Sequence, residues 1–175
     1  MLAAIQFIVY QVVWFACAFS DVWGMPWLGP VSALAYLFWV SFDLPVVWRA
    51  AAAMGLAGAL CDSLLMHLGF ISFNTSMWPS WISPAWMIAL WACFSVPLIT
   101  SFGWLAKRRW LAVLLGGVGG PMAYAGGAEI GAMQLSDPNL PALVAIGIAW
   151  AVVTPIAVGW GQKLAATVPT NEVTA

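Results

Sequence analysis

The stretch Val46–Gly69, V-V-W-R-A-A-A-A-M-G-L-A-G-A-L-C-D-S-L-L-M-H-L-G, decides the fold of this 175-residue chain. A helix that crosses a hydrocarbon layer about 30 Å thick needs about 20 mainly apolar residues, and this stretch supplies them. It holds a basic residue, Arg49, near its start, and it keeps Asp62 and His67 close to its other end. The stretch therefore predicts a transmembrane helix and raises the question of what two polar side chains do inside it.

The composition of the whole chain extends this prediction. Hydrophobic residues make up 64% of the sequence and charged residues only 6%, whereas a soluble domain carries about 25% charged residues. A surface this poor in charge has to face lipid. We expect one transmembrane bundle over residues 1–165 and a short polar cytoplasmic tail over 166–175. The net charge of −1 and the lack of a long basic patch exclude nucleic acid as a partner.

Several further segments are long and apolar enough to cross a membrane. Together they predict an all-α polytopic transmembrane helix bundle. The first segment could instead be a signal peptide, but no basic residue precedes it, so we expect a retained span. Prolines mark the entrances of the second, fourth and sixth segments. The six expected spans are about Leu2–Ser20, Leu28–Phe42, Val46–Gly69, Trp81–Ala106, Trp110–Met133 and Leu140–Leu164.

The basic residues give the bundle a direction. Arg49 lies at the start of the third span, Lys107, Arg108 and Arg109 fill the turn between the fourth and fifth, and Lys163 closes the sixth. With six spans, all five then lie on one side of the membrane. Because short cytoplasmic loops are enriched in Lys and Arg, this pattern places both termini in the cytoplasm, an N-in/C-in topology.

Three ionisable side chains lie within the expected spans, namely Asp62, His67 and Glu129. Such groups cost about 2.5–3.5 kcal/mol on insertion scales and are functional candidates for that reason. We expect all three in the outer half of the membrane. Asp62 and His67 are five residues apart, about 140° around a helix, so they cannot share a helical metal motif. With one histidine in the chain and three irregularly spaced cysteines, no metal site is expected.

The fifth span is unusually rich in glycine. The spacings Gly116-x-x-x-Gly120 and Gly127-x-x-x-Gly131 allow a neighbouring helix to approach closely. Pro121 removes one backbone donor, so a kink or a break is expected there. Two interpretations stay open, a tightly packed kinked helix and a broken helix that marks a binding or transport site.

The third and fifth spans also resemble each other. A shift of 62 residues brings three glycines and two polar positions into register. The pattern hints at repeated helical hairpins, although small residues also recur in membrane spans by chance. The five residues Gly55, Gly58, Asp62, His67 and Gly69 align with Gly117, Gly120, Tyr124, Glu129 and Gly131.

Several motifs together resemble a known family. They are Gln11-x-x-Trp14-Phe15, Gly58-x-x-x-Asp62, Pro84-x-Trp86-Met87-x-x-Leu90-Trp91 and Gly116-x-x-Gly119-Gly120-Pro121-x-Ala123-Tyr124-x-x-Gly127-x-x-x-Gly131-Ala132. Over nearly the whole chain, apart from the tail after Lys163, the sequence is similar to domain of unknown function 2878, a family of small bacterial inner-membrane proteins. The resemblance implies a multi-pass protein of the bacterial inner membrane and a link to envelope lipids. It also carries over six residues: Gln11, Trp14, Asp62, Trp91, Pro121 and Tyr124.

The first functional hypothesis is a protein that handles a lipid or a small amphipathic molecule in a polar pocket open to the outer half of the membrane. Asp62 would hydrogen-bond or transfer protons, and we expect it to face the bundle near Tyr124 and the first span. Tyr124 and Gln11 would orient a headgroup, and Trp14 and Trp91 would wall the pocket. His67 and Glu129 are secondary candidates.

Two rival hypotheses belong to other classes. One is a non-catalytic scaffold subunit of a membrane complex, which requires a membrane-protein partner. The other is a small secondary transporter in which Asp62 carries a proton. No motif for a nucleophile with its base is readable, so the sequence indicates no enzyme class and no cofactor. Under the first hypothesis the partners are membrane lipids.

Reporter fusions test the expected direction. A fusion at Asn74 should report the periplasm and a fusion at Arg108 the cytoplasm, because all five basic residues then lie inside. A cytoplasmic signal from Asn74 would contradict the six-span, N-in topology.

Overall fold

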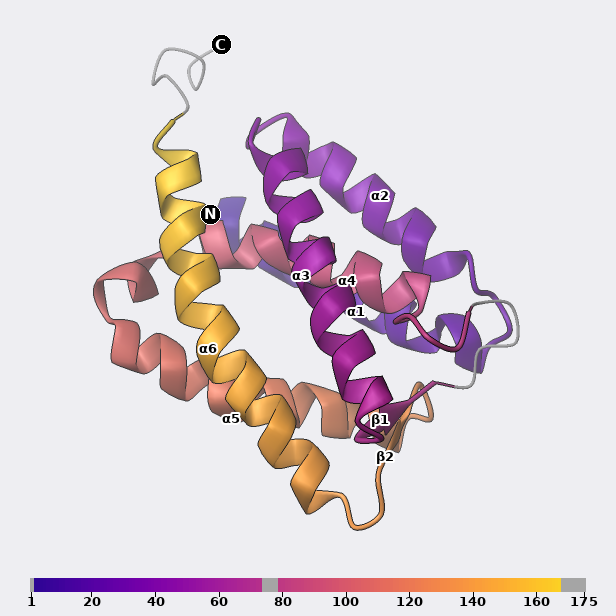
Figure 1. The fold of residues 1–175 in the computed structure, drawn as a ribbon. Coiled ribbons are helices and arrows are strands. Elements are labelled where there is room, and N and C mark those ends of the chain that lie inside the picture. Colours follow the sequence, from indigo (N-terminus) through magenta and orange to yellow (C-terminus); the bar gives the residue numbers. More distant parts are fainter. Residues whose placement is uncertain (1, 74–78, 168–175) are drawn as a thin grey trace.

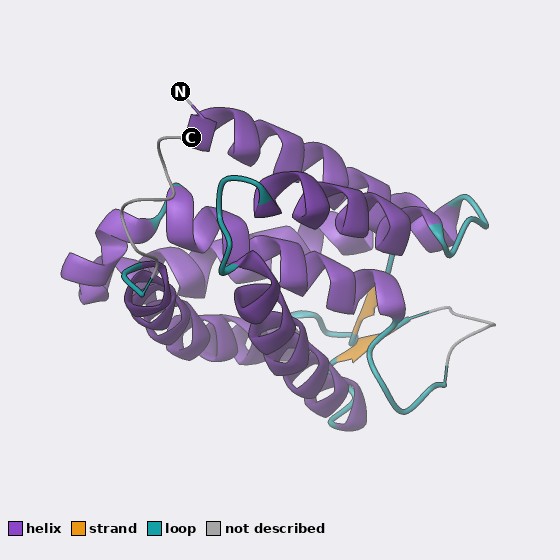
Figure 2. Ribbon diagram, turned by 90° about the horizontal axis from the view of Figure 1, so that it is seen from above, coloured by secondary structure: helices purple, strands orange, loops and turns teal. Residues whose placement is uncertain are grey.

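The computed structural model describes residues 2–73 and 79–167, and it is all-helical apart from two short strands (Figures 1 and 2). Asn74, one site of the reporter test, and most of the expected polar tail lie outside the described residues. The helices are α1 (Leu2–Val22), α2 (Leu28–Ser41), α3 (Val47–His67), α4 (Ala85–Thr100), η1 (Gly103–Lys107), α5 (Arg109–Glu129) and α6 (Leu140–Ala165), and the strands are β1 (Ile71–Ser72) and β2 (Gln134–Leu135).

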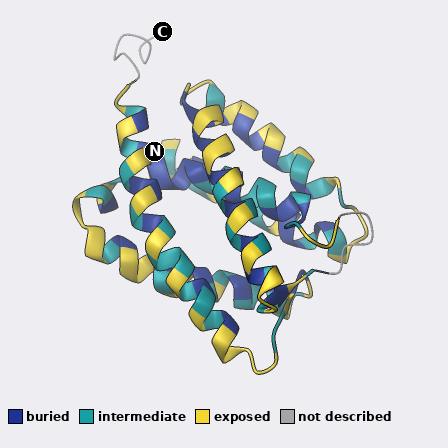
Figure 3. Ribbon diagram, viewed as in Figure 1, coloured by how far each residue is buried: buried dark blue, intermediate teal, exposed yellow. Residues whose placement is uncertain are grey.

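The six α-helices correspond to the six segments expected from the sequence. Four of them, α1, α3, α5 and α6, are long and apolar enough to cross a membrane, and α2 and α4 are shorter apolar helices. Large apolar side chains such as Ile8, Leu60 and Ile156 are exposed. Exposed positions recur along the helices of the bundle (Figure 3). An apolar exterior on helices of this length is what a membrane protein requires.

Three helix boundaries differ by four or more residues from the sequence-based expectation. The fourth helix ends at Thr100 rather than Ala106, and the chain then forms the separate 3-10 helix η1. The fourth helix begins at Ala85 rather than near Trp81, because Pro84 is extended, with φ −64° and ψ 155°, and caps the helix. The fifth helix ends at Glu129 rather than Met133, because Gly131 adopts a left-handed conformation with φ +81°. The residue after that glycine donates its backbone N–H to the Gly127 carbonyl, the pattern that closes a helix C-terminus.

The chain folds as three helical hairpins. Helix α1 packs on α2, α3 on α4, and α5 on α6, while both α1 and α2 also pack on α4. The two strands pair antiparallel at the ends of α3 and α5 (Figure 2). The start of α1 and the end of α6, in contrast, lie at the other end of the bundle (Figure 1).

The similarity between the third and fifth spans has a structural counterpart. Gly58 of α3 lies against the indole ring of Trp91 on α4, and Gly120 of α5 lies against the indole ring of Trp150 on α6. Both first helices then end at a glycine with positive φ, +75° at Gly69 and +81° at Gly131. The two hairpins α3–α4 and α5–α6 are therefore built alike.

The two hairpins also meet each other through equivalent parts. Strands β1 and β2, which follow the two glycines, pair Ile71 with Leu135 and Ser72 with Gln134. The rings of Trp91 and Trp150 stack with their centroids 4.4 Å apart and an interplanar angle of 22°. In both contacts, an element of one hairpin meets the corresponding element of the other: β1 meets β2, and Trp91 meets Trp150. An approximate two-fold relation between the hairpins would produce such contacts.

Helix α5 is continuous through Pro121, so the break considered from the sequence does not occur. Helix α6 makes room for the proline ring at Gly147, where an added Cβ would lie 3.3 Å from Pro121 Cγ. Close packing against a neighbouring helix allows a transmembrane helix to tolerate a missing backbone hydrogen bond.

We predict that Gly120→Leu lowers the melting temperature and the folded yield of the protein. The leucine Cβ alone would lie 2.3 Å from Trp150 Cγ, so α5 and α6 would have to separate. Overpacking of this kind costs about 1–3 kcal/mol, occasionally more. The measurement is thermal unfolding of the purified protein in detergent, followed by size-exclusion chromatography.

Gly126→Leu is the matched control for this prediction, because a Cβ at Gly126 of the same helix meets no atom within 4 Å. Equal melting temperatures for the two variants would contradict tight packing at Gly120.

Candidate functional site

Asp62 of α3 is fully buried and accepts two hydrogen bonds from other helices. Trp91 Nε1 of α4 donates to Oδ2 over 2.8 Å, and the Tyr124 hydroxyl of α5 donates to Oδ1 over 2.5 Å. Each carboxyl oxygen thus has its own donor. The side chain joins three helices, and it faces the interior of the bundle as the sequence analysis expected.

The local sequence of α3 explains why Trp91 can reach Asp62. Gly58 lies one turn before the acid, and an added Cβ there would be 2.0 Å from Trp91 Cγ. Because Gly58 has no side chain, the indole ring lies directly on α3 and its N–H points to the next turn. Any larger residue at this position would displace the ring and separate the donor from the carboxyl.

Trp150 of α6 completes an aromatic group around this network. Its ring stacks on Trp91 and lies 6.4 Å from the ring of Tyr124, with an interplanar angle of 75°. Offset stacked and edge-to-face pairs of this kind add about 0.5–1.5 kcal/mol each beyond the area they bury. The four side chains of Asp62, Trp91, Tyr124 and Trp150 are called the carboxyl–aromatic cluster below.

The cluster lies beside a cavity of about 580 Å³. Residues of α1, α4, η1, α5 and α6 line it, and most of them are aromatic or aliphatic. Trp91, Tyr124 and Trp150 form part of its wall, whereas Asp62 lies behind Trp91 and Tyr124 and does not line it. The polar pocket expected from the sequence is thus a mainly apolar cavity with few polar groups.

The cavity gathers most of the residues selected from the sequence. Gln11 and Trp14 of α1 line it together with Trp91 and Tyr124. No hydrogen bond joins Gln11 to Asp62, whose donors come from α4 and α5 rather than from the first helix. The cavity and the carboxyl–aromatic cluster share Trp91 and Tyr124, and therefore form one site in which these two side chains separate the cavity from Asp62.

The glycines and proline of α5 have different positions in relation to this site. Gly116, Gly120 and Gly127 line the cavity, while Pro121 and Gly131 do not. Gly116 and Gly120 also lie against Thr154 and Trp150 of α6, whereas Gly127 lies against the side chain of Met133. Glycine thus allows close contact with α6 and at the same time leaves space on the cavity side of α5.

The two secondary candidates lie away from the site. His67 is exposed in the last turn of α3, where its Nδ1 is 2.8 Å from the Ser63 carbonyl. Glu129 is exposed at the end of α5. Neither lines the cavity. Among the residues that the structure describes, no group of three or more His, Cys, Asp or Glu could hold a metal ion.

The structure also reveals a second pair of an acid and an indole. Asp21 Oδ2, in the last turn of α1, accepts a hydrogen bond of 2.7 Å from Trp86 Nε1. This acid does not stand out in the sequence, because it lies near the predicted end of a span, where a charge needs no explanation. Helix α4 thus donates from Trp86 and Trp91 to carboxyl groups on two different helices.

These features define a class of protein: a helical bundle with four helices long and apolar enough to cross a membrane, an apolar exterior, and an internal cavity beside a buried carboxyl. The chain belongs to the family of proteins of unknown function DUF2878, whose sequence pattern matches residues 3–156. The match includes every residue of the carboxyl–aromatic cluster and of the cavity lining. No curated protein and no solved structure matches the chain.

We predict opposite effects from two substitutions of Asp62. Asp62→Asn should fold with little loss of stability, because the amide oxygen can accept from Trp91 while the amide N–H donates to the Tyr124 oxygen. Asp62→Leu should lower the free energy of unfolding by about 1–3 kcal/mol for each donor left buried without an acceptor. Thermal or denaturant unfolding in detergent measures both.

Tyr124→Phe supplies the control for this prediction. Combined with Asp62→Leu it should cost less than the sum of the single variants, because the two residues share one hydrogen bond. Additive effects, or an Asp62→Leu variant as stable as the unchanged protein, would show that the carboxyl has no stabilising partners.

Proposed function

We propose that this is a multi-pass protein of the bacterial inner membrane that binds a lipid or a small amphipathic molecule in the cavity between α1 and α5. The proposal includes six membrane spans with both termini in the cytoplasm. The observation that carries it is the cavity itself, because its size is in the range of about 300–1,000 Å³ common for small-molecule sites and its lining is mainly apolar.

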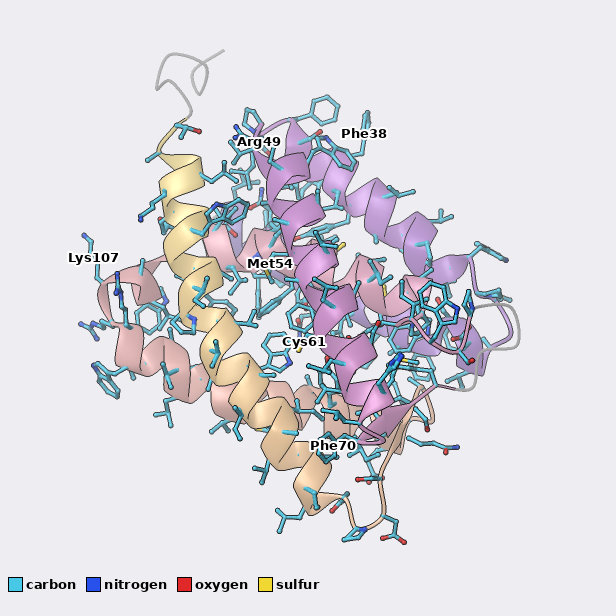
Figure 4. All side chains as sticks on the ribbon, in the orientation of Figure 1. Phe38, Arg49, Met54, Cys61, Phe70 and Lys107 are labelled. Atoms are coloured by element: carbon cyan, nitrogen blue, oxygen red, sulfur yellow. The ribbon has the colours of Figure 1, made fainter. Side chains whose placement is uncertain are left out.

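The positions of the basic residues support the six-span topology. Arg49 lies in the first turn of α3, and Lys163 lies in the last turn of α6. Lys107, Arg108 and Arg109 lie at the junction of η1 with α5. All five side chains are exposed. Arg49 and Lys107 point outward from the part of the bundle that also holds the start of α1 and the end of α6, whereas Phe70 lies at the opposite end (Figure 4). A membrane with its cytoplasmic face at Arg49 and Lys107 satisfies the positive-inside rule.

The lengths of α2 and α4 also fit this arrangement. At 1.5 Å per residue, their 14 and 16 residues measure about 21 and 24 Å, less than the hydrocarbon thickness of about 30 Å. Short spans are accommodated by local thinning of the bilayer and by interfacial anchors. Trp104 and Trp110, exposed beside the basic junction, are residues of the type that anchors helices at the interface.

The way the helices pack supports an entrance to the cavity from the lipid. Helix α1 packs on α2 and α4, whereas α5 packs on α6 and η1, and the cavity lies between these two groups. Several lining residues are also exposed: Gln11 and Phe15 on α1, and Leu115, Gly119 and Met122 on α5. A molecule dissolved in the bilayer could therefore enter sideways between α1 and α5.

The shape of the lining supports a ligand with a chain. Phe102 and Leu105 line the cavity at the η1 end of the bundle, and Ala132 and Met133 line it at the strand end. The cavity therefore extends along most of the length of the bundle between η1 and the strands, and in the proposed topology it would reach into both halves of the membrane. In this proposal the carboxyl–aromatic cluster holds one wall of the cavity rigid, because Asp62 fixes both Trp91 and Tyr124.

We predict that Gly119→Trp removes bound lipid without unfolding the protein. A Cβ at Gly119 meets no atom within 4 Å, and this residue lines the cavity, so a bulky side chain would occupy the ligand's space. The lipid retained by the purified protein should fall at least roughly tenfold, a difference of about 1.4 kcal/mol in binding free energy. Native mass spectrometry after extraction of the protein from bacterial membranes measures this retention.

Gly126→Trp is the matched control, since an added Cβ there is also free of contacts but Gly126 does not line the cavity. The control should retain lipid like the unchanged protein. Equal retention by all three proteins, at equal melting temperatures, would refute lipid binding in this cavity.

A further inference from the structure

The lining of the cavity carries no charge among the described residues. No Asp, Glu, Lys, Arg or His is part of it, and Trp91 and Tyr124 separate it from the carboxyl of Asp62. A charged group without a partner is strongly disfavoured in such surroundings. A charged lipid can therefore place only its chains in this cavity, and its headgroup has to bind outside, at the membrane interface.

Three consecutive basic residues, Lys107, Arg108 and Arg109, form the basic junction between η1 and α5. Lys107 ends η1, Arg108 is the N-cap residue of α5 and Arg109 is its first residue, and all three are exposed. Trp104 of η1 is exposed as well, and the guanidinium carbon of Arg108 lies over its ring, 6.0 Å from the centroid. A cation in this position is attracted by the face of the indole. The basic junction thus combines positive charge with an aromatic ring of the type that lies at a membrane interface.

The acidic residues that the structure describes do not neutralise this charge. None of them forms an ion pair with the basic junction. Asp62 is engaged with its two donors inside the bundle, and Asp43 lies in the turn between α2 and α3. The other three lie toward the strand end of the bundle: Asp21, Glu129 and Asp137. The basic junction is therefore complementary in charge to an anion that the described part of the chain does not supply.

The basic junction adjoins one end of the cavity. Phe102, directly before η1, and Leu105, within η1, both line the cavity. Leu105 is buried, whereas its neighbour Trp104 is exposed. One side of η1 therefore closes the cavity while the other side faces outward, beside the three cations.

The opening between α1 and α5 leads toward the same place. Leu115, Gly119 and Met122 of α5 line the cavity and are exposed. They follow Arg108 by about two, three and four turns of a helix with 3.6 residues per turn, so they share one side of α5. Arg108 lies at the start of α5 above this side. A chain that entered the opening would run along α5 away from Arg108.

We propose that the basic junction binds the phosphate of an anionic phospholipid whose acyl chain lies in the cavity. This inference rests on the proposed function and gives it a ligand class and an orientation. Arginine binds phosphate oxygens through two parallel N–H donors. A zwitterionic phospholipid also carries an ammonium group, which the three cations repel, so the site prefers a net negative headgroup. In the proposed topology this lipid belongs to the cytoplasmic leaflet.

Two phospholipids with identical acyl chains test the proposal on the full-length protein in a non-ionic detergent. Phosphatidylglycerol has a net negative headgroup, and phosphatidylethanolamine has a zwitterionic one. Competition between them in native mass spectrometry gives the ratio of their affinities, and the unchanged protein should prefer phosphatidylglycerol. An excess of glycerol 3-phosphate should not displace it, because this compound has no acyl chain. Displacement would show that the ligand is a free phosphate ester and would overturn the lipid.

Substitutions at the surface connect the preference to the basic junction. Arg108→Gln should reduce the preference for phosphatidylglycerol roughly fivefold, the factor expected for one cation near a membrane surface. Arg108→Lys should retain most of it, because the charge remains. Arg49→Gln is the matched control, since Arg49 is also an exposed arginine but lies well apart from Lys107 (Figure 4). It should show the preference of the unchanged protein. If Arg108→Gln fails to fold, Arg109→Gln replaces it.

Gly119→Trp separates this inference from the proposed function. It should weaken the binding of both lipids alike, because it fills the space of the chain and leaves the basic junction unchanged. No preference for phosphatidylglycerol in the unchanged protein, or equal loss of it in Arg108→Gln and Arg49→Gln, overturns the headgroup site while binding in the cavity stands. If Gly119→Trp leaves both affinities unchanged, the proposed function fails and this inference fails with it.

Discussion

The buried carboxyl of Asp62 is the constraint on which the rest of the interior depends. An acid at this depth must have a partner for each oxygen, and here the partners come from two different helices. Satisfying it fixes the rotation of α4, which presents Trp91, and of α5, which presents Tyr124. The stacking of Trp150 on Trp91 then places α6 as well. One polar residue thereby orders four apolar helices, whose side chains alone would allow many arrangements.

Much of the helical architecture could be predicted from the sequence, because hydrophobic length and the positions of proline and glycine are local signals. The segment Val46–Gly69 was identified to within two residues of α3 at each end. The start of α4 was predicted too early, since an apolar run continues through Trp81 and Ile82 before Pro84 prevents the helix from extending back. Local signals of this kind do not reveal how the helices pack against one another.

Only part of the candidate site could be predicted in the same way. Asp62 stood out because an acid in a membrane span needs a reason, and a shift of 62 residues aligned it with Tyr124, its partner in space. Thr154 gave no signal, since a threonine in an apolar helix is common and its place in the cavity lining depends on tertiary packing. The cavity itself arises from the gap between α1 and α5, which is a property of the whole bundle.

The likeness between the hairpins α3–α4 and α5–α6 has an evolutionary consequence. Asp62 and Tyr124 hold corresponding positions of the two hairpins and are in contact, so an exactly symmetric dimer of one hairpin would bring two copies of the same side chain together there. Two aspartates would repel each other, and two tyrosines would provide no carboxyl. Joining the hairpins in a single gene lets the two positions diverge into an acceptor, Asp62, and a donor, Tyr124. Two hairpins in one chain can carry different residues at these equivalent positions. An exactly symmetric dimer of identical hairpins cannot.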